Sequence, residues 1–141
     1  MGAVKVSILA ENAADRILFE TGHLEENKIR RMEIIMLVDT GAVLNLLPQD
    51  AVEELGLKSL GKVVVTYADD RKEELQKAGP LNISAGNRTA HTVCLVGPPT
   101  CEPLLGQTVL EELDLLVDSV QQKLVPRPES PYLPMVTLKR M

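Results

Sequence analysis

The chain carries Ile34-Ile35-Met36-Leu37-Val38-Asp39-Thr40-Gly41-Ala42 at the point that decides its fold. The apolar run from Ile34 to Val38 predicts a strand inside the protein, and this strand leads directly into a turn that begins with a carboxylate. Asp-Thr-Gly occurs once in 141 residues. If Asp39 is catalytic, it has no equivalent in its own chain. This single occurrence therefore bears on quaternary structure as well as on chemistry.

Size and composition indicate one ordinary globular domain. The chain has 141 residues and a mass of 15.4 kDa, with 45% hydrophobic and 25% charged residues, which is enough to build a core. Its aromatic residues are Phe19, Tyr67 and Tyr132, so we expect a core of Val, Leu, Ile and Ala. Few aromatic side chains and a net charge of −5 argue against nucleic-acid binding, which uses stacking and basic surfaces.

The sequence carries no membrane, secretion or metal signal. No stretch approaches the roughly 18 apolar residues of a membrane span, and the N-terminus does not resemble a signal peptide. Cys94 and Cys101 do not form a disulfide framework, and His23 and His91 stand in no zinc-binding pattern. We therefore expect no metal, no cofactor, no membrane partner and a cytoplasmic location.

Alternating apolar residues and turn residues predict mostly strands. The expected strands are residues 4–8, 17–20, 32–38, 63–67, 81–84, 89–96, 115–118 and 123–125, and the expected helices are 48–56 and about 108–113. Pro48 suits the first turn of its helix, and Gly56 ends it. Many short strands with two short helices predict an all-β protein, specifically a small closed β-barrel.

The last residues differ in character from the rest. Pro126, Pro128, Pro131 and Pro134 lie close together, and proline disfavours both helices and central strands. We therefore expect a barrel domain over residues 1–126 and an extended tail over residues 127–141. Met135 to Leu138 could add one strand, either at a sheet edge or in a dimer interface; otherwise the tail merely trails.

Three separated motifs resemble the retropepsins, the retroviral-type aspartic proteases and their cellular relatives. The motifs are Leu37 to Ala42, Leu46-Leu47-Pro48, and Leu104-Leu105-Gly106 before a short helix. The segments around 43–57 and 105–111, the latter followed by Leu124-Val125-Pro126, are more similar to the small prokaryotic members than to the viral ones. The resemblance covers about residues 1–126 and implies the β-barrel of the acid proteases.

The resemblance also implies an activity and a partner. Asp39 would be the catalytic carboxylate of an endopeptidase, and an active enzyme would be a C₂ homodimer with one Asp39 from each subunit. The two carboxylates would share one proton and hold a water molecule between them. This water would attack the carbonyl carbon of a peptide bond in a peptide or protein substrate.

The remaining roles follow from the same resemblance. Thr40, Gly41 and Ala42 would shape the active-site loop, with the Thr40 hydroxyl reaching the other subunit. Leu104, Leu105 and Gly106 would support that loop from behind. The hairpin tip occupies the position of the flap, the lid over the substrate; it comprises Tyr67, Ala68, Asp69, Asp70 and Arg71.

The chain departs from the viral pattern in three places, one of which is the proline-rich tail from Pro126, which exceeds the minimal fold. The expected flap tip has no glycine, and the acid and arginine that pair in viral members are here Val43 and Gln107. Asp39 could also be a simple turn former, and Asp69 to Arg71 a solvated hairpin tip. The alternative function is a dimeric binding or scaffolding module that keeps the barrel without turnover.

Overall fold

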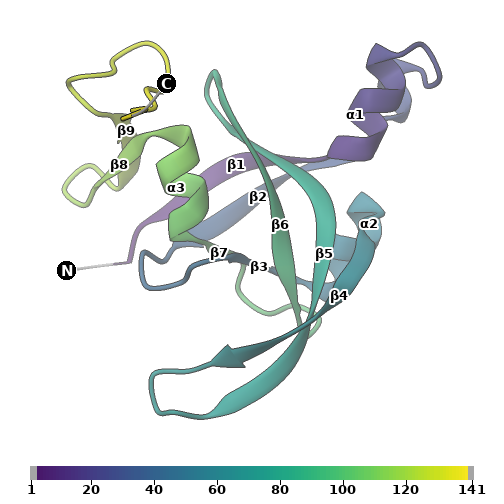
Figure 1. The fold of residues 1–141 in the computed structure, drawn as a ribbon, viewed down its shortest axis with the longest axis horizontal. Coiled ribbons are helices and arrows are strands. Elements are labelled where there is room, and N and C mark those ends of the chain that lie inside the picture. The colour runs from purple at the N-terminus through teal and green to yellow at the C-terminus, as the bar shows by residue number, and fades with distance from the viewer. Residues whose placement is uncertain (1–2, 140–141) are drawn as a thin grey trace.

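The computed structural model describes residues 3–139, and Figure 1 labels their helices and strands in chain order. The strands are β1 (Lys5–Asn12), β2 (Arg31–Val38), β3 (Asn45–Pro48), β4 (Lys58–Thr66), β5 (Lys72–Ala85), β6 (Arg88–Gly97), β7 (Leu104–Leu105), β8 (Leu115–Asp118) and β9 (Lys123–Pro126). The helices are α1 (Ala13–Glu20), α2 (Gln49–Leu55), α3 (Gln107–Leu113) and a short 3₁₀ turn, η1 (Glu26–Lys28).

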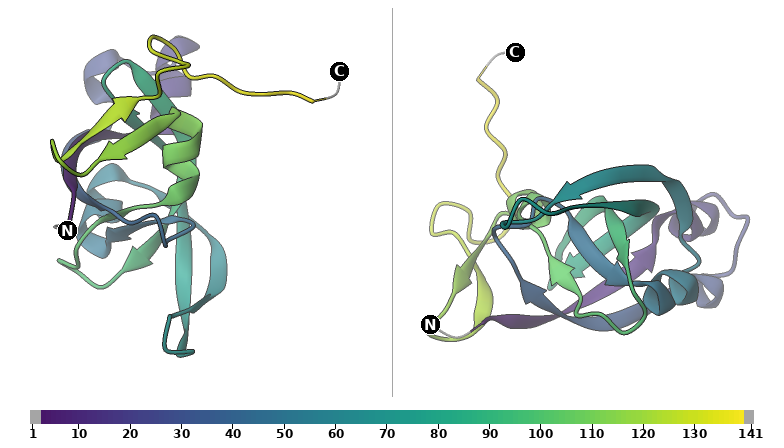
Figure 2. Two further views of the ribbon diagram at one scale, coloured as in Figure 1. Left: turned by 90° about the vertical axis from the view of Figure 1, so that its left-hand side faces the viewer. Right: turned by 90° about the horizontal axis from the view of Figure 1, so that it is seen from below.

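Six strands close into a ring. The main sheet has the order β1-β2-β7-β3-β6-β5-β4, and β1 also pairs with β5, so the sheet returns on itself and leaves β4 outside the ring. The pairs β2–β7 and β3–β6 are parallel, and the other neighbours are antiparallel. Figures 1 and 2 show β4 and the first part of β5 projecting from the barrel as a long hairpin. The predicted mainly-β closed barrel is confirmed.

Aliphatic side chains fill the barrel. The largest fully buried side chains include Met36, Leu47, Leu55, Leu81, Ile83, Leu105 and Leu113, and no aromatic residue belongs to the buried core within residues 3–139. On β2, Ile34 and Met36 point inward while Ile35 is exposed, as the period of two in a strand requires. The core composition that the sequence predicted is therefore confirmed.

One predicted element has the wrong type. Residues 17–20, predicted as a strand, form the second half of α1. The cause is the cap, because the Asn12 side chain accepts a hydrogen bond from the Asp15 amide at 3.0 Å. Asp15 then accepts two hydrogen bonds from the guanidinium of Arg30. A four-residue apolar run does not distinguish a strand from a helix, and here the cap and tertiary contacts decide.

The remaining elements fall into two groups. Some lie where the sequence predicted them but have different bounds, and others were not predicted. α2 and α3 lie where helices were expected, and Gly56 ends α2 with φ +65°, a left-handed conformation that glycine adopts easily. The strands β4 and β5 are longer than predicted. The short strands β3 and β7 were not predicted, since two to four residues are too few to show a period.

Figure 2 shows the C-terminal tail leaving the barrel. It contains no strand within residues 127–139, so Met135 to Leu138 adds no strand to this subunit's own sheet; a strand shared with a partner remains a prediction. The base of the tail is anchored at the end of α3. The Asp114 carboxylate accepts hydrogen bonds from the Arg127 side chain, the Ser130 hydroxyl (2.6 Å) and the Met135 amide (2.9 Å). Buried Arg88 donates to the carbonyl of Ser130.

The Asp114 carboxylate should make folding stability depend on pH. Hydrogen bonds from Arg127, Ser130 and the Met135 amide hold its pKa well below the usual range. A carboxyl whose pKa is lower in the folded chain than in the unfolded chain stabilises the fold while ionised, and this is lost as the pH falls below about 4. We predict that wild type loses more stability than Asp114→Asn between about pH 6 and pH 2.5, measured by urea unfolding.

The control is Asp70→Asn, which removes a carboxylate from the exposed hairpin tip and should keep the pH dependence of wild type. Equal pH dependence in Asp114→Asn and wild type would contradict the prediction.

Candidate active site

The strand that precedes Asp39 has the two-residue strand β7 beside it. Leu37 pairs with Leu104 and Val38 with Leu105 in parallel. On its other edge, β7 pairs antiparallel with β3, and Leu46 lies opposite Leu104. β3 follows the Asp39 loop in the chain and runs in the direction opposite to β2 and β7. The loop from Asp39 to Leu44 therefore begins and ends on two strands that the same short segment holds together. This brings all three predicted motifs together, with Leu104-Leu105 between the other two.

Backbone hydrogen bonds fix the turn at Asp39. The Asp39 amide donates to the Leu105 carbonyl at 3.0 Å, and the Ala42 amide donates to the Asp39 carbonyl at 3.1 Å. The Gly41 amide donates to the Asp39 carboxylate at 3.0 Å, so the side chain is held in one orientation. A Cβ atom at Gly41 would lie 3.3 Å from that carboxylate oxygen, so a side chain there would press on the carboxylate. Asp39 is half-buried and Thr40 is exposed.

The first residues of α3 hold the second half of the loop. The Gln107 amide donates to the Ala42 carbonyl at 2.7 Å, and the Thr108 hydroxyl donates to the Val43 carbonyl at 2.6 Å. Gly106, just before α3, lies against the loop itself, since a Cβ atom there would be 2.7 Å from the Leu44 carbonyl carbon and oxygen. The third residue of the Leu-Leu-Gly motif is therefore required for close packing of two backbones.

Asn45, which was not among the predicted site residues, also takes part in this arrangement. Its side chain is 1% exposed; it accepts a hydrogen bond from the Gly106 amide at 2.9 Å and donates to the Val93 carbonyl at 3.1 Å. One signal was available, because an amide between Leu44 and Leu46 is a polar residue in an apolar run, and buried polar groups are normally there to make hydrogen bonds. Thr108 carried no comparable signal.

The expected flap tip is stabilised by its own residues. The Tyr67 hydroxyl donates to Glu73 at 2.6 Å, which raises the pKa of this tyrosine, and the Arg71 guanidinium stacks over the Tyr67 ring at 4.4 Å. Arg71 also forms an ion pair with Asp69. Asp70 adopts φ +65° at the turn, a conformation that Asp tolerates, so the tip forms without glycine. Ala68 is exposed beside it.

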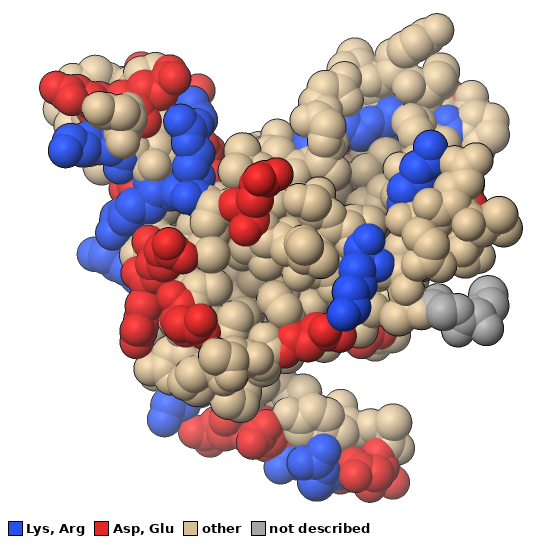
Figure 3. Space-filling view, turned by 180° about the vertical axis from the view of Figure 1, so that it is seen from behind, with Lys and Arg blue, Asp and Glu red and all other residues tan. Residues whose placement is uncertain are grey.

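Charged side chains of both signs cover this hairpin, which is the lower projection in Figure 3. Lys62 on β4 pairs with Glu74 on β5 across the two strands. The hairpin and the Asp39 loop come from different parts of the chain, and none of the hydrogen bonds or ion pairs of residues 3–139 joins Tyr67–Arg71 to Asp39–Ala42.

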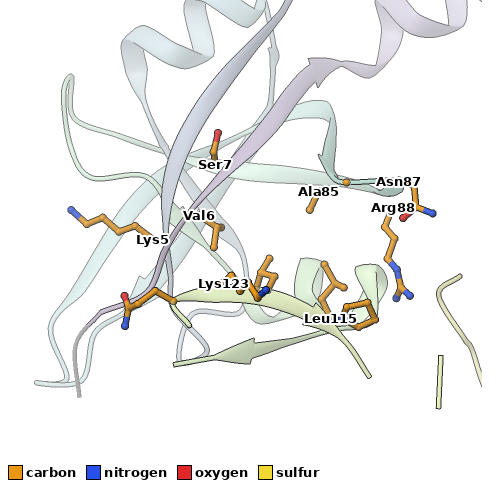
Figure 4. A pocket seen from close by; sticks show the side chains of 12 residues that line it. Lys5, Val6, Ser7, Ala85, Asn87, Arg88, Leu115 and Lys123 are labelled. Atoms are coloured by element: carbon orange, nitrogen blue, oxygen red, sulfur yellow. The ribbon is translucent and has the colours of Figure 1, made fainter. Parts of the chain in front are cut away.

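Two surface pockets lie near the barrel. Thr40 is at the edge of one of them, together with Gln107, Leu116 and Met135. The other lies between the start of β1, the β5–β6 turn and the β8–β9 hairpin, where Figure 4 shows Lys5, Arg88 and Lys123. Asp39 lines neither pocket. The Asp39 carboxylate is half-buried, and its hydrogen bond to the Gly41 amide is exposed in the single subunit.

No cluster of potential metal ligands is present among the described residues. Within residues 3–139, no three His, Cys, Asp or Glu side chains come together in an arrangement that could hold a metal ion. In the same part of the chain, no helix has the length and apolar character needed to span a bilayer.

Comparison with solved structures identifies the fold. The chain is similar to EIAV protease, solved in complex with the inhibitor HBY-793, with a TM-score of 0.56 and 17% sequence identity over 79% of this chain and 88% of that protease. No protein-family model and no curated protein matches the sequence. At this identity the likeness concerns the fold alone. The chain therefore has the retropepsin-like fold that its motifs predicted.

Gly106 should be intolerant of a side chain. We predict that Gly106→Ala destabilises the protein by about 1–3 kcal/mol, because the added Cβ meets the backbone of Leu44, which cannot move aside as a side chain can. The measurements are urea unfolding and the NMR amide signals of Asp39 to Ala42, which should shift.

The matched control is Gly86→Ala. A Cβ atom there meets nothing, but φ is +62°, so a backbone cost of about 1–2 kcal/mol is expected without any change at Asp39. Unshifted Asp39-loop signals in Gly106→Ala would contradict the close approach.

Proposed function

We propose that this protein is a homodimeric aspartic endopeptidase in which Asp39 of each subunit supplies one of two catalytic carboxylates. The observation that supports this most strongly is the turn at Asp39. Its carboxylate is held in a fixed orientation at the surface of the subunit by the Gly41 amide, in the fold of a viral protease. The sequence supplies this motif once, so the second carboxylate must come from a second copy.

The chemistry of the proposed site needs only the two side chains and a water. Two close carboxylates share one proton, because both ionise together only at a large electrostatic cost. The ionised one takes a proton from the water as it attacks the peptide carbonyl, and the protonated one donates to the carbonyl oxygen. The fixed turn contributes by holding each carboxylate in position before the substrate arrives.

The proposed partners are a second subunit and an extended peptide. The exposed Thr40 side chain is available to contact the partner subunit's loop at the two-fold axis. The β4–β5 hairpin would cover the bound peptide and exclude water, with Tyr67 to Arg71 at its tip. Greater similarity to the small prokaryotic retropepsins, carried by the residues around 43–57 and 105–111, is part of the same proposal.

One observation favours a second candidate function, a dimeric binding module. The tip of the hairpin is closed by contacts among Tyr67, Asp69, Arg71 and Glu73, so those side chains already have partners. A lid that must rearrange over each substrate would have to break these contacts. A module that only binds an extended peptide would not.

Asp39→Asn separates the two candidates. We predict that this substitution lowers peptide cleavage by about 10²–10⁴-fold or more and leaves the fold and the dimer intact, because the amide can still accept the Gly41 hydrogen bond. The measurement is digestion of a broad peptide library, with sedimentation of the same samples.

Asp118→Asn is the matched control, since Asp118 also accepts hydrogen bonds from the amides of its own turn, at Val120 and Gln121, and should keep activity. Absence of cleavage by pure wild type between about pH 4 and pH 7 would favour the binding module.

Activity should also depend on association. We predict that activity per subunit falls on dilution, and that excess Asp39→Asn protein inhibits a fixed amount of wild type, because mixed dimers carry only one carboxylate. The rate is measured against total concentration and against added variant. Activity that stays constant per subunit in both titrations would show that one chain suffices.

A further inference from the structure

The contacts between the Asp39 loop and α3 involve only uncharged groups. Val43 and Gln107 occupy positions on the two sides of this junction, and the hydrogen bonds across it join backbone amides, carbonyls, the Thr108 hydroxyl and the Asn45 carboxamide. Among these, Asn45 is the buried side chain that reaches both β6 and the residue before α3.

Asn45 acts on the candidate site through Gly106. The residues on either side of Gly106 both contact the Asp39 turn: the Leu105 carbonyl accepts from the Asp39 amide, and the Gln107 amide donates to the Ala42 carbonyl. The Asn45 oxygen accepts from the Gly106 amide between them at 2.9 Å. Fixing Gly106 therefore fixes both groups that hold the turn at its start and at its end.

The other end of the carboxamide determines its orientation. The Asn45 nitrogen donates to the Val93 carbonyl at 3.1 Å and lies 3.4 Å from the Thr92 hydroxyl, both on β6. A carboxamide supplies the acceptor and the donor that these two ends require. Because the side chain is 1% exposed, water does not replace either partner at low cost.

We propose that Asn45 is the positioning residue of the Asp39 site, and that it holds the carboxylate turn through Gly106 without any group that ionises. This inference rests on the proposed protease function for its kinetic consequences, while its structural part is independent of turnover. It goes beyond the motifs, because Asn45 lies outside all of them.

The ionisable groups around Asn45 are either neutral or already have hydrogen-bond partners. Cys94, next to Thr92–Val93 and opposite Asn45 in the β3–β6 pairing, has its pKa raised to about 12 by burial and stays a neutral thiol. On α3, Glu111 accepts from the side chain of half-buried Gln107, and Glu112 accepts from the His91 amide. The His91 ring is hydrogen-bonded to the Asn82 side chain on β5. Asp39 itself is the group being positioned.

Asn45→Asp tests the proposal because it keeps the shape and introduces a charge that depends on pH. When protonated, the new carboxyl can still accept from Gly106 and donate to Val93. When ionised, it has no donor for the Val93 carbonyl and is a buried charge, so burial raises its pKa by up to about 3–5 units. We expect the ratio of kcat for Asn45→Asp to kcat for wild type to fall about tenfold per pH unit above that pKa, with KM changing less.

Asn27→Asp is the matched control, since Asn27 is exposed in η1 and the same change of charge should leave the pH profile of wild type unchanged. Asn45→Ala, which has neither donor nor acceptor, should lose activity at every pH. A pH profile of Asn45→Asp that follows wild type would overturn the proposal.

Hydrogen exchange gives a second measurement that needs no turnover. The Asp39, Gly106 and Gln107 amides should exchange at least about tenfold faster in Asn45→Ala than in wild type, while amides of the β5–β6 pairing should not change. Unchanged exchange at those three amides would overturn the proposal even if wild type cleaves peptides. Faster exchange at those amides in Asn45→Ala, together with no peptide cleavage by wild type, would support the proposal and refute the protease function instead.

Discussion

The parallel pairing of β2 with the two-residue strand β7 is the constraint on which the rest of the site depends. It places the Leu105 carbonyl where it accepts from the Asp39 amide, and it brings Gly106 against the loop that Asp39 begins. A two-residue strand has little stability of its own. It persists here because β2 lies on one side and β3 on the other, and because Leu105 is fully buried.

The fold places its charges and its neutral polar groups differently. Ion pairs lie at the periphery: Asp15 with Arg30 fastens α1, and Asp114 with Arg127 fastens the tail. Next to Asp39 the connecting groups are amides, carbonyls and one hydroxyl. A charge buried beside the Asp39 carboxylate would change the electrostatics of that carboxylate, whereas neutral hydrogen bonds hold its turn in place without doing so.

The charged tip of the β4–β5 hairpin is the feature that bears on its proposed role as a lid. Its tip makes an ion pair, a cation–π contact and a short hydrogen bond within itself, and these contacts are exposed, so each contributes modestly. Rearrangement of the tip over a substrate would break several contacts of modest strength and would leave charged side chains without their partners.

The sequence by itself determined the barrel and the turn at Asp39. An apolar strand before Asp39, glycine at Gly41 and the Leu104-Leu105-Gly106 motif are local patterns, and their combination predicted both the fold and the candidate residues. The sequence also predicted α2 and the β8–β9 pair, because helix-ending residues and short apolar runs are short-range signals.

Only the tertiary structure decided the remaining features. Residues 17–20 became helical because Arg30, 15 residues from Asp15, fastens the first turn of α1 and adds to the local cap at Asn12, and β7 became a strand because two neighbours pair with it. Asn45 gained its role from residues 48 and 61 positions away in the chain. Hydrogen bonds between distant segments depend on where the barrel closes, and a local pattern carries no information about that.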